Sequence, residues 1–341
     1  MYKISVIVLN WNGLQFLEAC LSSLRKQTFR EFETIVVDNG STDQSVAYVR
    51  NNFPEVRLVE LHKNMGFAGG NNAGYEVALG EWIVLLNNDT EAEPRWLEEI
   101  WKAAQENPGA GAIASKMLYF DERKRIDNCG FNVTRAGMTT DLGRSELDGI
   151  EWSRPRSVFG PCGGAAAYRR EMLRNIGFLD EELFIIFEDV DLAFRMQICG
   201  YACVLAPTAI VYHRYRQSLG KHPAGPVYFS QRNIELVYFK NMPAALMARY
   251  LPERFLYEVG AAIYFLRHGA GIAFVKGKLA AIWHLPSILR KRSAIQKSRT
   301  LSNGQLRTLL ADAGLSAKWK KFWAPRVTET EKALKARPST G

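Results

Sequence analysis

Short apolar segments alternate with segments of helical periodicity in the first third of the chain, and this alternation restricts the fold more than any other feature. The apolar segments are rich in β-branched residues and uninterrupted, as is typical of strands buried on both faces; they cover residues 3–11, 33–39, 56–61 and 82–86. Helices are predicted over residues 14–24, 73–79 and 94–101, with one more after Gln44. Such alternation predicts an α/β fold with a parallel sheet.

Polar residues stand where three of these predicted strands end. They are Asn10, the pair Asp38-Asn39 and the triplet Asn87-Asn88-Asp89. Ligands of open parallel sheets bind outside the carboxyl ends of the strands. We therefore expect the binding site of this protein at that edge of the sheet.

The alternation stops near residue 120. Residues 120–160 are polar, rich in glycine and hairpin-like. The later predicted elements are a strand over 160–168, a helix over 170–176, a helix that begins with acidic residues at Glu188, a strand over 202–213, and helices with basic faces within 241–341.

Composition excludes several classes of protein. A chain of 341 residues with 47% hydrophobic residues is neither disordered nor a small disulfide scaffold. The five cysteines include no Cys-x-x-Cys pair, so a zinc site is not expected and a reducing cytoplasm is favoured. We also expect no signal peptide, and no run reaches the ~18 uninterrupted apolar residues of a membrane span.

The basic charge of the chain is concentrated in its C-terminal third. Residues 249–341 carry a net charge of +13, whereas residues 1–248 carry −4. Strongly apolar helix faces in this region carry Phe274 and Trp283 beside lysines and arginines. Basic amphipathic helices of this kind suit an anionic membrane surface. The alternative is that they pack on the rest of the chain or on a second copy of it.

Two segments of the first half could contact a nucleotide. Asp38 can accept the imide N–H of uracil or thymine, although a carboxylate there also suits a turn. The segment from Asn64 to Gly74, with Gly66 and Asn71, is predicted as a Gly/Asn loop whose backbone N–H groups suit phosphate at a helix start. A tight turn without a ligand explains the same composition.

The triplet Asn87-Asn88-Asp89 follows an apolar strand and ends in a carboxylate. Mg²⁺ and Mn²⁺ prefer oxygen ligands and keep substrate oxygens in their coordination shell. The triplet can therefore hold a divalent cation on a diphosphate, or it is an Asx turn.

Acidic residues gather at one predicted helix start, where Glu188, Asp189 and Asp191 alternate with apolar positions. The helix dipole stabilises negative charge there, which is a structural reason for the pattern. The functional alternative is a general base held where an acceptor hydroxyl arrives. His213 ends the strand over 202–213, and a histidine in this place is usually a hydrogen-bonded structural residue.

Taken in order, six motifs resemble the family 2 glycosyltransferases, in particular the rhamnosyltransferase-like enzymes of bacterial cell-surface polysaccharide assembly. The resemblance covers about residues 3–240, and the motifs are Ser-Val-Ile-Val-Leu-Asn-Trp-Asn, Val-Asp-Asn-Gly-Ser-Thr-Asp, Asn-Met-Gly-Phe-Ala-Gly-Gly-Asn-Asn, Leu-Asn-Asn-Asp, Asp-Glu-Glu-Leu-Phe-x-x-x-Glu-Asp-Val-Asp-Leu-x-x-Arg and Val-Tyr-His. It implies a GT-A fold: a Rossmann-like nucleotide-sugar-binding half over 1–115 and a mixed-sheet acceptor half over 116–240. The basic helical region over 241–341 follows.

The same resemblance implies a role for each motif residue. Asp189 would be the catalytic base, and Glu188 and Asp191 would assist acceptor binding or position the base. Asp89 would hold the divalent cation, with His213 as a further ligand. The residues implied to bind the nucleotide sugar or line the cleft are Asn10, Asn12, Asp38, Asn64, Gly66, Asn71, Asn87, Asn88, Asp89, Gly163 and Gly164. The triplet lacks the first aspartate of the family's D-x-D pattern, which implies a one-carboxylate site completed by diphosphate and water.

The resulting hypothesis is an inverting, metal-dependent transferase with Mg²⁺ or Mn²⁺ as cofactor. It would move L-rhamnose from dTDP-L-rhamnose to a lipid-linked saccharide on the cytoplasmic face of the membrane, with peripheral membrane contact and no nucleic-acid partner. A UDP-hexose or UDP-galactofuranose donor and a homodimer are open alternatives. A sugar-nucleotidyltransferase would need a basic, Gly-rich segment after the first strand, where Asn10-Trp11-Asn12-Gly13 stands. A non-enzymatic binding protein would leave the acidic residues unexplained.

Overall fold

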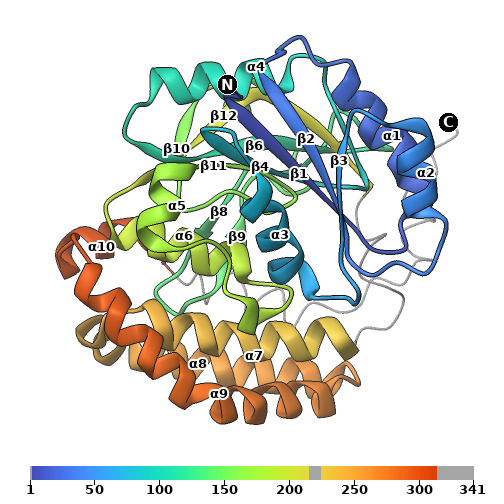
Figure 1. Cartoon of the computed structure of the whole chain (residues 1–341). Coiled ribbons are helices and arrows are strands. Elements are labelled where there is room, and N and C mark those ends of the chain that lie inside the picture. Colours follow the sequence, from blue (N-terminus) through green and yellow to red (C-terminus); the bar gives the residue numbers. More distant parts are fainter. Residues whose placement is uncertain (1, 215–223, 313–341) are drawn as a thin grey trace, which may run out of the picture.

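The computed structural model describes residues 2–214 and 224–312, and a mixed sheet forms its centre (Figure 1). Within these residues, the strand order of the main sheet is β10-β12-β6-β11-β4-β1-β2-β3, with β5 beside β12 and β7 beside β6. The strands are β1 (Ile4–Asn10), β2 (Phe32–Asp38), β3 (Arg57–Glu60), β4 (Trp82–Asn87), β5 (Thr90–Ala92), β6 (Ala110–Tyr119), β7 (Ile126–Asn128), β10 (Arg156–Val158), β11 (Ala165–Arg169) and β12 (Ala202–His213), and a separate hairpin pairs β8 (Phe131–Val133) with β9 (Thr139–Asp141).

Strand direction divides this sheet into two halves. Strands β1 to β4 pair in parallel, as the alternation of strands and helices predicts. Strand β11 then pairs antiparallel with both β4 and β6, and β12 pairs parallel with β6. The carboxyl ends of β1, β2, β4 and β12 therefore lie at the same edge of the sheet.

Helices cover both faces of the sheet and add a further layer below it (Figure 1). The α-helices are α1 (Leu14–Arg25), α2 (Ser45–Asn52), α3 (Gly66–Val77), α4 (Trp96–Glu106), α5 (Arg170–Ile176), α6 (Glu188–Ile198), α7 (Ala224–Asn241), α8 (Ala244–Arg267), α9 (Gly271–Ser298) and α10 (Asn303–Leu309), and the 3-10 turns are η1 (Ile150–Trp152) and η2 (Glu181–Leu183). One core packs α1, α2 and α4 on the sheet, a second packs α3, α5 and α6 on the opposite face, and a third joins α6 to α7–α10.

Helix α3 differs from the prediction, because it begins at Gly66 rather than Ala73 and so includes most of the Gly/Asn segment. Glycine disfavours helices, which is why its composition predicts a loop. The small residues are needed for packing: a Cβ on Gly70 would lie 2.4 Å from Leu9 Cδ1, and one on Gly74 would lie 2.6 Å from Ile7 Cγ2. Close contact with the sheet therefore outweighs the low helix propensity.

The C-terminal region is helical, as predicted, through α10, which ends at Leu309, and residues 313–341 lie outside the described residues. Helix α7, which the sequence patterns did not reveal, precedes this region and packs along α9. The expected division at 115/116 falls inside β6, and the one at 240/241 falls at the end of α7.

Among the described helices, α9 alone is long and apolar enough to cross a membrane. Lys276 and Lys278 interrupt its apolar run, so α9 meets this condition by length and mean hydropathy and not by an uninterrupted run. Lys278 Nζ pairs with Glu258 at 2.6 Å and also with Glu235, which joins one face of α9 to α7 and α8.

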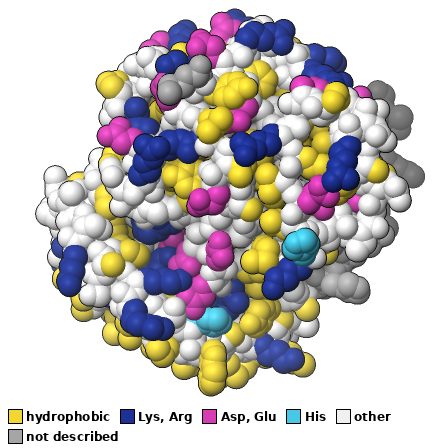
Figure 2. Space-filling view, in the orientation of Figure 1, with side chains coloured by type: hydrophobic (Ala, Val, Ile, Leu, Met, Phe, Trp, Pro, Cys, Tyr) yellow, Lys and Arg dark blue, Asp and Glu magenta, His cyan; other side chains and the backbone are white. Residues whose placement is uncertain are grey.

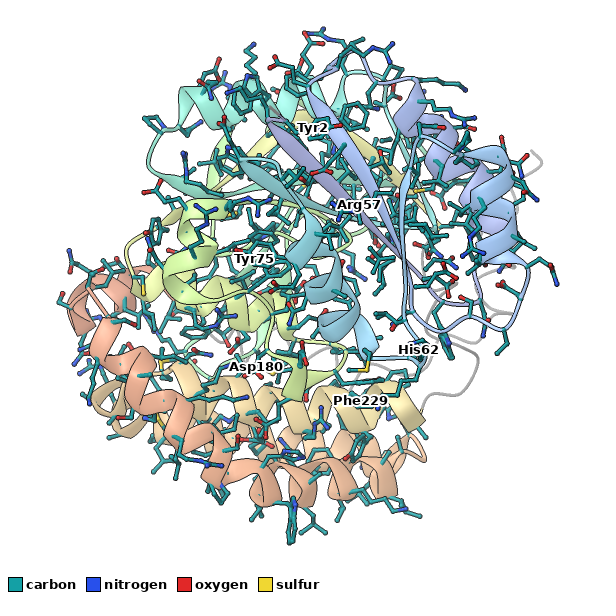
Figure 3. All side chains as sticks on the ribbon, viewed as in Figure 1. Tyr2, Arg57, His62, Tyr75, Asp180 and Phe229 are labelled. Atoms are coloured by element: carbon teal, nitrogen blue, oxygen red, sulfur yellow. The ribbon has the colours of Figure 1, made fainter. Side chains whose placement is uncertain are left out.

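An ion-pair cluster, formed by Asp180, Glu182, Asp191, Lys240 and Lys291, joins the helical layer to the α/β part. Lys240 Nζ lies 2.5 Å from Asp180 and 2.7 Å from Asp191, and Lys291 Nζ lies 2.6 Å from Asp180 and 2.7 Å from Glu182. Asp180 is labelled in Figure 3, where it lies between the two parts. Removal of one partner from a buried ion pair costs about 3–5 kcal/mol, so this cluster holds the helical layer firmly in place.

The packing of α3 generates a prediction about stability. Gly74→Ala should lower the free energy of unfolding by about 1–3 kcal/mol, because overpacked cores lose this much. Gly260→Ala in α8 is the matched control, since a Cβ there meets nothing within 4 Å; we expect a gain of about 0.4–1 kcal/mol from the lower entropy of the unfolded chain. Urea unfolding measures both values, and a gain in stability for Gly74→Ala would contradict the packing of α3.

Candidate active site

Three strand ends form one hydrogen-bonded group at the carboxyl edge of the sheet. Asn88 Nδ2 donates to Asn10 Oδ1 at 2.8 Å, and Asn10 Nδ2 donates to Asp38 Oδ1 at 3.3 Å. The other oxygen of Asp38 accepts the N–H of Ser41 at 2.9 Å, which is the turn geometry that the sequence left open. Asn10, Asp38 and Asn88 are all buried. The structure thus brings together residues that lie up to 78 positions apart in the chain.

The remaining candidates on the nucleotide side shape the loops around this group. Asn12 Oδ1 accepts the N–H of Thr42 at 2.8 Å, and Asn64 Oδ1 accepts the N–H of Gly66 at 2.8 Å. Gly66 has a φ of +74° and touches the segment after α5: a Cβ there would lie 2.4 Å from the Phe184 carbonyl oxygen. Asn71 donates to the Phe67 carbonyl inside α3 and is buried, so its amide serves the helix.

Asp89 and His213 lie side by side, as the sequence predicts for two strand ends at one edge. Antiparallel pairing of β5 with β12 sets His213 opposite Thr90, and His213 Nε2 lies 3.4 Å from Asp89 Oδ1. The other ring nitrogen of His213 lies 2.7 Å from Asp127 Oδ2. Burial lowers the pKa of His213, but hydrogen bonds and charge from Asp127 and Asp89 raise it to about 9.

Asp89 and His213 fit a divalent cation only where substrate phosphates and water supply the remaining oxygen ligands. The described part of the chain has no group of three or more His, Cys, Asp or Glu residues placed to hold a metal ion. Asp89 and His213 are close enough to bind one cation together, and Asp127 holds the imidazole ring from behind, as carboxylates do for metal-bound histidines. Mg²⁺ and Mn²⁺ sites often take their remaining oxygens from substrate phosphates and water.

Asp127 was missed by the sequence patterns, together with its neighbours Asp141 and Arg144. Arg144 Nε lies 3.0 Å from Asp141 Oδ2, and its Nη2 lies 3.8 Å from Asp127 Oδ1. Burial raises the pKa of Asp141, and Arg144 partly offsets this. All three residues lie in the hairpin-like stretch, and Asp127 is separated from His213 by 86 positions. No local pattern could have shown that they meet.

Asp189 occupies the first turn of α6 and faces the sheet edge. Its Oδ2 accepts the N–H of Gly163 at 2.9 Å, and its Oδ1 accepts the N–H of Val190 at 2.8 Å. Burial raises the pKa of Asp189 to about 6, and these two N–H groups limit the rise. The adjacent Gly164 carbonyl accepts the N–H of Asn87 at 2.9 Å. The Gly163-Gly164 turn therefore joins the carboxylate of Asp189 to the strand end that precedes Asp89.

The two other acidic residues of this helix have different surroundings. Glu188 is buried, and burial together with the neighbouring Asp189 raises the pKa of Glu188 well above its ordinary value. Asp191 is fully buried in the ion-pair cluster, where it also pairs with Arg195 at 2.9 Å. Burial alone would raise the pKa of Asp191, but Lys240 and Arg195 lower it. Asp191 thus faces the helical layer rather than the sheet edge.

Known proteins resemble this chain in sequence. Residues 5–177 match the sequence profile of Glycosyl transferase family 2. An N-acetylglucosaminyl-diphospho-decaprenol L-rhamnosyltransferase of Mycobacterium tuberculosis is 28% identical over 64% of this chain and 78% of its own length. The O-antigen biosynthesis protein RfbC of Myxococcus xanthus is 29% identical over 62% of this chain, and the uncharacterized protein y4gI of Sinorhizobium fredii is 28% identical over 70%. The chain spans only 17% and 27% of these two longer proteins.

Solved structures agree on the fold. The structure of GalNAc-T7 with UDP, GalNAc and Mn²⁺ superposes on this chain with a TM-score of 0.58 and 16% identity. The match covers 70% of this chain and 48% of the GalNAc-T7 chain. The structure of TarS residues 1–349 from S. aureus superposes on this chain with a TM-score of 0.54 and 18% identity. The match covers 95% of this chain and 93% of that TarS chain. The fold is the GT-A fold with a C-terminal helical region, as the sequence motifs imply.

Proposed function

The chain belongs to glycosyl transferase family 2, and from this premise we propose that it is an inverting, metal-dependent glycosyltransferase. It would move a sugar from a nucleoside diphosphate to a hydroxyl group of a lipid-linked saccharide. The mycobacterial relative supports L-rhamnose as the transferred sugar and a polyprenyl-diphosphate saccharide as acceptor. The donor would then be dTDP-L-rhamnose, which the family resemblance of the sequence motifs implies. A UDP-hexose or UDP-galactofuranose remains the alternative donor.

One observation carries this proposal: the Gly163-Gly164 turn joins Asp189 to the end of β4, and Asp89, which follows that strand, lies beside His213. Gly163 donates to Asp189, and Gly164 accepts from Asn87. A carboxylate suited to act as a base and a pair of residues suited to hold a cation therefore share one edge of the sheet. Transfer needs both functions, because the hydroxyl must lose a proton and the diphosphate must gain negative charge.

Asp189 would take the proton of the acceptor hydroxyl as the hydroxyl oxygen forms its bond to the anomeric carbon. The bond from that carbon to the diphosphate breaks in the same step. The configuration at the anomeric carbon is therefore inverted, and the nucleoside diphosphate leaves. A pKa of about 6 leaves Asp189 ionised at neutral pH while keeping it basic enough to accept the proton.

Asp89 and His213 would hold the divalent cation, and Asp127 would fix the orientation of the imidazole. When bound, the cation supplies charge stabilisation to the leaving diphosphate as a Lewis acid. Asp38, Asn10, Asn12, Asn64, Gly66, Asn87 and Asn88 would form the nucleotide-sugar side of the cleft. Asn71 would act only through helix α3.

The surroundings of Glu188 and Asp191 support positioning rather than acceptor contact. Asp191 is enclosed by Arg195, Lys240 and Asn241, whose Nδ2 donates to it at 2.8 Å. Its charge would therefore anchor the first turn of α6 instead of reaching an acceptor. Glu188 would support Asp189 as a buried neighbour with a raised pKa.

The apolar face of α8 and α9 supports peripheral contact with the cytoplasmic side of the membrane, since a lipid-linked acceptor is found there. Hydrophobic side chains line the lower rim of the molecule in Figure 2. Trp283 is 84% exposed, Ile272 77% and Phe255 64%. Lys276 and Arg290 lie exposed on the same helix α9. Buried apolar area and attraction to anionic lipid both contribute to this kind of binding.

Loss of the base should abolish most of the transfer. Asp189→Asn should reduce kcat by about 10²- to 10⁴-fold, the usual contribution of a general base, while binding of dTDP stays near normal. Wild-type kcat/KM should fall about tenfold per pH unit below pH 6, because only the ionised carboxylate accepts a proton. Glu171→Gln, an exposed residue of α5, is the control. Wild-type turnover in Asp189→Asn would exclude it as the base.

The cation should be required and should depend on Asp127. Excess EDTA should stop transfer, and added Mn²⁺ should restore it. Asp127→Asn should weaken Mn²⁺ binding in the presence of dTDP by about 10- to 100-fold, as loss of a partner of a metal-bound histidine does; calorimetry measures this directly. Glu122→Gln, an exposed acid of the same region, should leave binding unchanged. Full activity in excess EDTA would show that Asn87-Asn88-Asp89 forms a turn and binds no catalytic cation.

Membrane contact is tested with anionic vesicles. Trp283→Ser should weaken binding at all salt concentrations, and Lys276→Glu with Arg290→Glu should weaken it mainly at low salt, because salt screens charge but not apolar insertion. Lys291 and Arg292 are unsuitable for this test, since Lys291 pairs with Asp180 and Arg292 donates to the Phe239 carbonyl. Ile150→Ser, which is 85% exposed and lies in η1 rather than in α8 or α9, is the control. If the wild-type protein does not bind the vesicles, the membrane proposal is wrong and the apolar face would pack against another protein.

A further inference from the structure

The segment that leads into Asp189 has an unusual backbone. Phe184, Ile186 and Phe187 have φ angles of +65°, +70° and +76°. Residues other than glycine rarely adopt this left-handed region, and for a β-branched residue such as Ile186 it is a clear outlier. Such conformations persist only where the surroundings hold them, and they gather at functional sites.

The side chain that holds this segment is Asn233 of helix α7. Its Nδ2 donates to the carbonyl oxygens of Leu183, Ile185 and Ile186 at 2.8, 2.9 and 2.6 Å. Asn233 is fully buried. The two N–H groups of one amide thus contact three carbonyl groups that precede or lie between the strained residues.

Arg232 supports the same contact. Its Nε donates to Asn233 Oδ1 at 2.8 Å, which fixes the orientation of the amide. Its Nη2 donates to the carbonyl oxygens of Glu182 and Leu183 at 3.0 and 2.8 Å. The ring of Phe229, labelled in Figure 3, stacks on Phe184 at 5.5 Å. Helix α7 therefore contacts the segment from Glu182 to Ile186 through Phe229, Arg232 and Asn233, which lie on consecutive turns.

The segment also reaches the nucleotide side of the site. The Phe184 carbonyl accepts the N–H of Ala68 at 3.1 Å, in the first turn of α3. At its other end the segment passes directly into α6, where Phe187 is the N-terminal flanking residue and Asp189 stands in the first turn. Its conformation therefore sets where Asp189 lies relative to α3.

We propose that Asn233 is a positioning residue for the reaction: its amide holds residues 183–186 in the conformation that places Asp189 against the Gly163 turn. The inference rests on the proposed function of Asp189 as base. It assigns a role in the chemistry to helix α7, which belongs by packing to the helical layer.

The test variant is Asn233→Asp, which keeps the size of the side chain and its acceptor for Arg232 but removes the N–H donors. We expect kcat for transfer from dTDP-L-rhamnose to fall about 10- to 100-fold, since small misplacement of a catalytic group has effects of this size. The KM for the donor and the binding of dTDP should change less than threefold. Should Asn233→Asp fail to fold, Asn233→Ser, which keeps one donor, gives the same comparison.

Glu235→Gln is the matched control, because Glu235 lies on the same helix and pairs with Arg254 and Lys278 away from the segment. It should lower Tm without changing kcat more than threefold. An equal loss of kcat in Glu235→Gln and Asn233→Asp, or normal kcat in a folded Asn233→Asp, would overturn the proposal.

Hydrogen exchange separates this proposal from the proposed function. Amides of residues 183–190 should exchange faster in Asn233→Asp than in Glu235→Gln, whatever sugar the wild type transfers. Unchanged exchange would overturn the role of Asn233. Wild-type protein that transfers no sugar from any nucleotide donor would instead overturn the proposed function.

Discussion

Parallel pairing of β4 with β1 and of β1 with β2 is the constraint on which the site depends. Parallel strands end at a common edge, and the register here sets Asn10 beside Asp38 and Leu9 beside Asn87. A slip of one residue would turn each polar end toward the opposite face. The apolar residues of β1 and β4, which are buried on both sides, make such a slip costly.

The antiparallel strand β11 extends this edge without breaking it. It separates β4 from β6, so that β6 and β12 run in the same direction as β4. His213 therefore ends beside Asp89, and the turn before β11 carries Gly163 to Asp189. One inserted strand thus brings the second half of the chain to the edge that the first half provides.

The helical layer completes the site through buried charge. Asp191 is fully buried at the start of α6 and is neutralised by Lys240 and Arg195. Loss of these partners would leave a buried unpaired carboxylate and strongly destabilise the folded protein. The ion pair of Asp191 with Lys240 therefore holds α6 against α7. The consequence is that helices with an apolar outer face also secure the helix that carries Asp189. Contact with a membrane and placement of the base would then depend on one rigid layer.

The sequence by itself determined the elements whose side chains face the core. Periodicity predicted the strand over 202–213, the helix over 170–176 and the acidic start at Glu188, and the structure has these bounds. The polar ends of the first strands were also predictable, because parallel strands end at a common edge. The family resemblance implied that Asp89 and His213 share one cation, and the antiparallel pairing of β5 with β12 sets them side by side.

Only the tertiary structure decided the rest, since long-range contacts reverse local preferences. Helix α3 begins seven residues before its predicted start because its glycines pack on the sheet. Helix α7 escaped the patterns because it buries polar residues, including Asn233 and Lys240, whose partners are distant in the chain. Asp127 belongs to His213 only after the hairpin folds against β12. A side chain whose partner lies 50 to 90 positions away carries no local signal, so its role is set by the fold and not by its neighbours in the sequence.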